Sequence, residues 1–85
     1  MMYLESEKIL LQKNYRGYHN SLNTTYVSNI KPTDQVIFSE GINLERQKCW
    51  LVSFPLKFSK NNYTCYFNDK KEAKNYLNNI INTYI

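Results

Sequence analysis

The chain has 85 residues, which is enough for one domain with a modest core and too few for separate catalytic and substrate domains. Apolar residues make up 42% and aromatic residues 15%, including eight tyrosines, so the composition is that of a folding chain rather than a disordered one. The net charge of +4 lies mostly in residues 57–85, where five lysines face two acids, and this bias is compatible with an anionic partner.

The first residues and the apolar segments of the chain indicate the cellular compartment in which the protein is expected. No apolar run approaches the roughly 20 residues that a membrane span needs, and Glu5, Glu7 and Lys8 are not typical of a secretory signal. We therefore expect an intracellular, cytoplasmic protein without membrane contact, whose cysteines Cys49 and Cys65 stay reduced.

The first 30 residues carry weak patterns. The apolar residues between positions 3 and 11 fit a helical stripe that Glu7 interrupts, which favours a helix over about residues 4–14, although Ile9–Leu11 fits a short buried strand equally well. Residues 15–30 are polar and rich in Asn, Ser and Thr, so we expect an irregular loop that ends in a short strand at residues 25–28.

Strand patterns follow. Residues 35–39 form a strand candidate after the break at Lys31–Asp34, and residues 40–47 are expected to form a loop. Residues 49–58 alternate with period 2, which predicts a long strand. Pro55 has no N–H to donate, which predicts an edge position or a bulge. The predicted even-numbered face consists of Trp50, Val52, Phe54, Leu56 and Phe58.

A hairpin follows from the next segment. Residues 59–62 are typical of a turn, and residues 63–67 form the return strand. A register with apolar residues on both sides predicts the pairs Phe58 with Tyr63, Leu56 with Cys65, and Phe54 with Phe67. In this register Cys49 and Cys65 lie far apart on opposite faces, so we expect no disulfide.

The end of the chain predicts an amphipathic helix that begins after Asp69. Asp69 and Glu72 resemble a capping box. The apolar positions recur at helical spacing, and they are Ala73, Tyr76, Leu77, Ile80, Ile81 and Tyr84. The other helix face carries Lys70, Lys71 and Lys74 near its start.

Together these elements predict a small α+β fold in one domain over residues 1–85, with a three-stranded antiparallel sheet packed on the C-terminal helix. The element order is α-β-β-β-α, or β-β-β-α with an irregular N-terminal arm. The helix is expected to cover the even-numbered face of the long strand and to leave the opposite face open. That open face is predicted to carry Ser53, Lys57, Thr64 and Tyr66.

Residues for catalysis are scarce. His19 is the single histidine, and neither cysteine is placed beside it by a spacing that supports a nucleophile pair. No set of three or four metal ligands has suitable spacing, and the two glycines form no phosphate loop. We therefore expect a non-enzymatic protein with no cofactor and no small-molecule substrate.

A binding surface is the remaining possibility. Basic and polar side chains gather near the hairpin tip and the helix start, where they fit phosphate contact, with a solvated helix face as the alternative. The candidate nucleic-acid-binding residues are Lys57, Lys60, Lys70, Lys71, Lys74 and Tyr66.

Two families share parts of this pattern. The segment Phe67–Ala73, after a hairpin that contains Trp50, resembles the end of three-stranded-sheet-plus-helix DNA-binding domains of the ethylene-response-factor and tyrosine-recombinase arm-binding types. That resemblance implies that the sheet enters a DNA groove, with Trp50 as the family's strand tryptophan. Residues 70–74 also resemble the helix start of double-stranded RNA-binding domains, which implies lysine contacts to phosphates. We place DNA ahead of double-stranded RNA.

A protein partner is the alternative. A short α+β chain without catalytic residues, from an A+T-rich coding sequence, fits a phage or mobile-element inhibitor of the anti-CRISPR kind, which binds a host nuclease or defence protein. Because the chain is basic rather than acidic, such an inhibitor would act through the shape of a protein interface rather than by mimicking nucleic acid.

Overall fold

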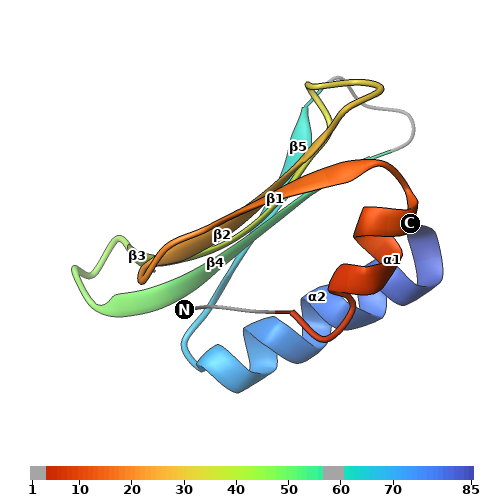
Figure 1. The fold of residues 1–85 in the computed structure, drawn as a ribbon. Helices are drawn as coiled ribbons and strands as arrows, with labels where there is room; N and C mark the ends of the chain where they lie inside the picture. Colours follow the sequence, from red (N-terminus) through yellow and green to blue (C-terminus); the bar gives the residue numbers. More distant parts are fainter. Residues whose placement is uncertain (1–3, 57–60) are drawn as a thin grey trace.

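A computed structural model describes residues 4–56 and 61–85. Five strands lie between two helices in the chain, so the order is α-β-β-β-β-β-α (Figure 1). The elements are α1 (Glu7–Gln12), β1 (Tyr15–His19), β2 (Asn23–Ser28), β3 (Gln35–Ile42), β4 (Lys48–Pro55), β5 (Asn62–Phe67) and α2 (Lys70–Tyr84).

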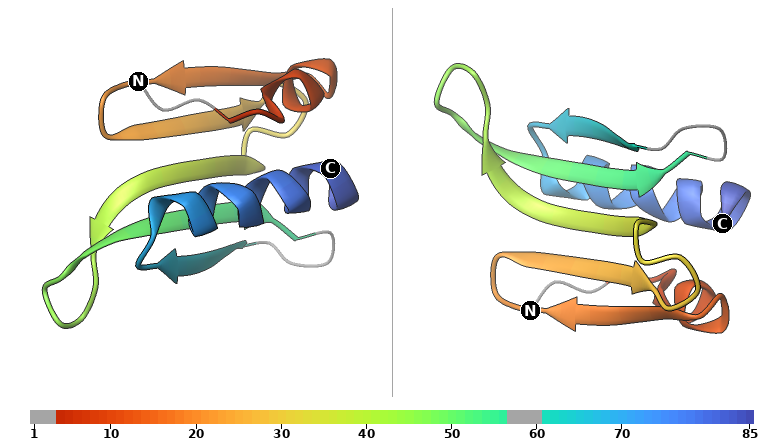
Figure 2. Two further views of the ribbon diagram at one scale, coloured as in Figure 1. Left: turned by 90° about the horizontal axis from the view of Figure 1, so that it is seen from below. Right: turned by 90° about the horizontal axis from the view of Figure 1, so that it is seen from above.

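The strands form one antiparallel sheet in the order β1-β2-β3-β4-β5, so each strand pairs with its neighbours in the sequence. Both helices lie on the same face of the sheet, and the described chain leaves the other face uncovered (Figures 1 and 2). The α+β class, the C-terminal helix and an N-terminal helix are confirmed. The predicted number of three strands is wrong, because the sheet has five.

The core lies between the helices and the covered face of the sheet. The even-numbered residues Val52 and Phe54 of β4 pack in one cluster with Leu77 and Ile81 of α2, which confirms the predicted packing of the helix on this strand. Leu10 of α1 joins the same cluster. The helices therefore bury one continuous apolar surface, which is the main stabilising contribution in a domain of this size.

The short strand expected at residues 25–28 is confirmed as the end of β2, but the irregular loop expected before it is wrong, because this segment forms the β1–β2 hairpin. The inward positions of β2 are Thr24, Tyr26 and Ser28, which are all buried, and the polar members hide the apolar alternation that marks a strand. The turn between the strands is held by the Asn20 side chain, whose Oδ1 accepts hydrogen bonds of 2.8 Å from the backbone N–H groups of Leu22 and Asn23.

The β4–β5 hairpin is confirmed, but its predicted register is wrong by four residues. The structure pairs Trp50 with Phe67, Val52 with Cys65, and Phe54 with Tyr63. The even shift keeps every side chain on its predicted face, since strand side chains alternate with period 2. The cause is the end of β4 at Pro55, which lengthens the connection, and the predicted partner Phe58 lies outside the described residues.

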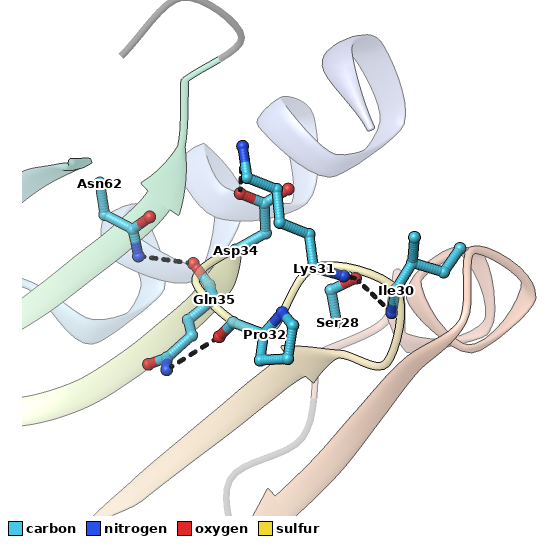
Figure 3. Close-up of polar contacts among 7 residues, drawn as sticks. All are labelled: Ser28, Ile30, Lys31, Pro32, Asp34, Gln35 and Asn62. Carbon is cyan, nitrogen blue, oxygen red and sulfur yellow. Dashed lines mark hydrogen bonds and ion pairs between the residues drawn. The ribbon is translucent and has the colours of Figure 1, made fainter. Parts of the chain in front are cut away.

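Pro55 occupies neither an edge strand nor a bulge, because β4 lies inside the sheet and Pro55 is its last residue. The register of β3 with β4 pairs Ile37 with Ser53 and, continued by two residues, places Gln35 opposite Pro55. Pro55 has no N–H to offer the Gln35 carbonyl. The Asn62 side chain donates to this carbonyl instead, with an Nδ2–O distance of 2.8 Å (Figure 3).

The turn before β3 is also built by a side chain. Ser28 Oγ accepts hydrogen bonds from the N–H groups of Ile30 (3.2 Å) and Lys31 (3.1 Å), and Lys31 Nζ lies 4.0 Å from Asp34 Oδ1 (Figure 3). The break predicted at Lys31–Asp34 is confirmed. The loop predicted at residues 40–47 is shorter, because β3 continues to Ile42.

Helix α1 is shorter than predicted, with six residues in place of the expected span of about 4–14. In α2, Asp69 is the N-cap residue as predicted, but its side chain makes no capping hydrogen bond. The two cysteines are free and lie on opposite faces of the sheet, in agreement with the expectation of no disulfide.

Candidate functional site

The structure does not bring the predicted basic residues into one described cluster. Lys57 and Lys60 lie outside the described residues.

The lysines at the start of α2 do lie together. Lys70 and Lys71 are exposed and Lys74 is half-buried. Lys70 Nζ lies 5.3 Å from the ring centroid of Trp50, within the range of a cation–π interaction. Asp69 and Glu72 share these turns, so residues 69–74 hold three lysines and two acids, which gives a net charge of only +1.

Tyr66 does not belong to the same surface as these lysines. It is 61% exposed and points to the uncovered face of the sheet, where it pairs with Leu51. Trp50, which Lys70 contacts, lies on the opposite, helix-covered face. The structure therefore separates the predicted aromatic contact from the predicted phosphate contacts.

The uncovered side of the sheet, here called the open face, is covered by neither helix of the described chain (Figures 1 and 2). One row of paired residues crosses all five strands, and it consists of Tyr18, Thr25, Ile37, Ser53 and Thr64. Leu51 and Tyr66 lie in the next row, and Val27 and Arg16 lie on the other side. Among the described strand residues of this face, Arg16 is the one charged side chain.

The predicted members of this face are confirmed where the structure describes them. Thr64 Oγ1 donates to Ser53 Oγ at 3.4 Å, and Ser53 itself is 5% exposed because its neighbours cover it. Lys57 lies outside the described residues. The half that β1 and β2 supply was missed, because the polar inward residues of β2 hid the strand.

The β3–β4 hairpin extends beyond the rest of the sheet (Figure 2). Its tip presents Ile42 and Leu44, which are 71% and 104% exposed. The loop is nevertheless well defined, because Asn43 Oδ1 accepts hydrogen bonds from the N–H groups of Glu45 (2.9 Å) and Gln47 (3.0 Å). The tip and Tyr66 border a shallow hollow of about 530 Å³.

A second hollow of about 640 Å³, here called the edge groove, lies beside β5 on the helix side. It is lined by Phe54, Pro55, Leu56, Tyr63, Tyr76, Ile80 and Tyr84. Cys65 Sγ lies 4.0 Å from Tyr76 Oη. A hydrogen bond with Cys65 raises the pKa of Tyr63, and burial followed by the same thiol raises the pKa of Tyr76.

His19 makes side-chain contacts that hold α1 against the sheet. Its Nε2 lies 3.0 Å from Glu7 Oε1 and its Nδ1 lies 3.2 Å from Thr24 Oγ1, so it joins α1 to the sheet. It sits in β1 at one edge of the sheet, whereas Cys65 sits in β5 at the other edge and Cys49 lies on the open face. The fold therefore assembles no cysteine–histidine pair.

Within residues 4–56 and 61–85, no three residues of the His, Cys, Asp and Glu types come together as a metal site. In the same residues, no helix combines the length and the apolar character that crossing a bilayer requires. No protein-family model, curated protein or solved structure matches the chain.

Proposed function

We propose that this chain is a small non-enzymatic binding protein that docks on another protein through its open face. The observation that carries the proposal is a five-stranded sheet with one bare side, whose described residues are apolar, tyrosyl or neutral apart from Arg16. The cores of protein interfaces are depleted in charge and enriched in tyrosine. A phosphate backbone instead needs several cations in a row.

The open face has the layout of an interface core with a polar border. Ile37 and Leu51 are half-buried near its middle, and Tyr18 and Tyr66, 53% and 61% exposed, stand on its two outer strands. Tyrosines in such positions supply large contacts with few rotatable bonds. Since the sheet is held by the core behind it, little conformational entropy is lost when a partner docks.

Charge indicates the chemistry of the partner surface. The chain carries +4 overall, and the exposed Arg16 lies on the outer strand β1 of the open face. A partner with an apolar centre and an acidic border is complementary to this arrangement. A nuclease or defence protein of a host, inhibited by a phage or mobile-element protein of the anti-CRISPR kind, is the class of partner and role that we propose.

Site-specific photo-crosslinking tests this proposal. A benzophenone amino acid in place of Tyr18 should give a discrete adduct with a partner in cells, and the same group at Asn79, on the exposed side of α2, should not. Leu51→Arg should abolish the Tyr18 adduct, because it places a charge in the interface core. Equal adducts from both positions, or an adduct that Leu51→Arg leaves unchanged, would contradict the open face as the docking surface.

Nucleic-acid binding at the helix start is the second candidate. It is favoured by the closeness of Lys70, Lys71 and Lys74 in the first turns of α2 and by the cation–π contact of Lys70 with Trp50. This contact would use phosphates rather than base edges, with DNA ahead of double-stranded RNA. The net charge of +1 in these turns predicts weak binding.

A salt titration of binding to duplex DNA and duplex RNA separates the candidates. Lys70→Glu with Lys71→Glu should lower the slope of log affinity against log salt by about 2 if both lysines contact phosphates. Lys8→Glu with Lys13→Glu in and after α1 makes the same change in net charge and is the matched control. Binding that is absent at low salt, or that both pairs reduce equally, would contradict the helix-start site.

A further inference from the structure

The two edge strands of the sheet differ in how well they are protected. The strand β1 carries the charged Arg16 beside Gly17, and both discourage pairing with another strand. The strand β5 is Asn-Tyr-Thr-Cys-Tyr-Phe, with no charge, proline or glycine. Exposed edges of this kind are templates for pairing with a further strand unless something covers them.

The edge groove adds apolar surface directly beside β5. Tyr63 and Tyr84 in the groove are 48% and 67% exposed, and Tyr66 on the other side of the strand is 61% exposed. At about 200 Å² for a whole tyrosine, these three side chains still expose roughly 350 Å². That is nearly half of the roughly 800 Å² that each partner buries in a standard interface.

We propose that β5 pairs antiparallel with β5 of a second copy of this chain, which joins two five-stranded sheets into one continuous sheet. A second copy fits this edge because two identical uncharged strands meet without repulsion, and a two-fold axis lets each edge groove face the other. The partner backbone satisfies the outward N–H and C=O groups of β5, and the apolar contacts beside the strand supply the remaining stabilisation.

The pleat limits the register of this pairing. Opposed residues in an antiparallel pair point to the same face, so the two-fold axis must lie midway between the two copies of one residue of β5. The registers that pair the most residues of this strand are those centred on Thr64 or Cys65. The Cys65 register places Tyr63 opposite the partner's Phe67 and Cys65 opposite the partner's Cys65. It forms two aromatic pairs on the helix side, so we assign this register.

The dimer leaves the proposed docking surface available except near Tyr66, which contributes to both surfaces. A two-fold axis perpendicular to the sheet keeps the open faces of both copies on the same side, so two binding surfaces become one larger surface. The two proposals share Thr64 and Tyr66, but they can fail separately, because Leu51 belongs to the open face alone and Cys65 lies on the helix side of β5.

Sedimentation equilibrium of the full chain tests the proposal. The wild type should have twice the monomer mass of 10.2 kDa at micromolar concentration. Thr64→Lys places two like charges near the axis and should weaken dimerisation at least tenfold, whereas the matched Thr83→Lys on exposed helix surface should not. A monomer at 100 micromolar, or a dimer that Thr64→Lys leaves unchanged while circular dichroism shows a folded chain, would overturn it.

The register has its own test, which needs no charged variant. Opposed residues of an antiparallel pair have Cα atoms about 4.5–5.5 Å apart, which is within the range of a disulfide. Mild oxidation with diamide should therefore join two copies through Cys65. Cys65→Ser should remove the covalent dimer, and Cys49→Ser should not, because Cys49 is 1% exposed. Absence of the crosslink in a wild-type dimer would overturn the Cys65 register.

Discussion

At the scale of single residues, Asn62 compensates for a proline inside a sheet. Its side-chain amide donates 2.8 Å to the Gln35 carbonyl, beside the position where Pro55 has no N–H. Asn62→Ala should therefore lower the free energy of unfolding by about 1–2 kcal/mol, since a partly buried carbonyl loses its donor. Urea denaturation measures this loss, with Asn29→Ala in an exposed loop as the control; equal effects of the two substitutions would refute the role.

Tyr15 gives a pH-dependent prediction. Burial, followed by the negative charge of Asp34, raises its pKa in the folded state above the usual 10.0. Above about pH 10 the unfolded chain therefore loses this proton while the folded chain keeps it, so the free energy of unfolding falls as pH rises. Tyr15→Phe should make the fall between about pH 9 and pH 11 shallower in urea titrations.

The free energy of unfolding of the Tyr15→Phe variant should still fall as pH rises, because the pKa values of Tyr63 and Tyr76 are raised as well. Tyr18→Phe, at an exposed position of the open face, is the matched control. An alkaline profile that Tyr15→Phe leaves identical to the wild type would contradict the folded-state burial of this phenol.

At the scale of elements, α1 depends on contacts with its neighbours. Six residues are too few for a stable isolated helix. Ser6, at its N-cap, donates from Oγ to Asn78 Oδ1 of α2 at 2.6 Å, and His19 of β1 contacts Glu7. The helix is therefore anchored by polar contacts at its start in addition to the burial of Leu10.

Removing the Asn78 anchor should loosen α1 alone. Asn78→Ala removes the acceptor of Ser6, and we expect amide hydrogens of α1 to exchange about tenfold faster while those of α2 keep their protection. Asn75→Ala, on the exposed side of the same helix, makes the same change in helix propensity and should leave α1 unchanged. Equal acceleration in both variants would show that the anchor is unimportant.

The elements also show what sequence patterns can predict. Helix α2 and strands β4 and β5 are recoverable because the residues by which they face the core are mostly apolar and keep a clear period. Of the hairpin β1–β2 only the end of β2 was predicted, because the inward residues of β2 include the polar Thr24 and Ser28, and because a turn held by Asn20 has no apolar pattern. The register error has a similar origin, since apolar residues continue past Pro55 although the strand ends there.

At the scale of the whole molecule, the candidate site depends on elements that only the fold brings together. The open face combines residues of all five strands, and Tyr18 and Tyr66 are 48 residues apart in the sequence. The sequence predicted Tyr66 as a contact residue on an open sheet face. It did not predict strand β1, and so it could not place Tyr18 on the same face. The local charge in the sequence predicted a binding site at the lysines of α2, and the fold places Lys70 on the helix-covered side of the sheet.

One core holds the sheet and both helices, so the molecule should unfold as a single unit. Leu77 is 0% exposed in this core, and Leu77→Ala should cost about 2–5 kcal/mol, a large part of the total stability expected for this size. Trp50 fluorescence and far-ultraviolet circular dichroism should shift to the same lower urea midpoint with an unchanged slope. Leu44→Ala makes the same chemical change at a residue that is 104% exposed and should leave stability unchanged; separate midpoints for the two probes would show that the helices and the sheet unfold independently.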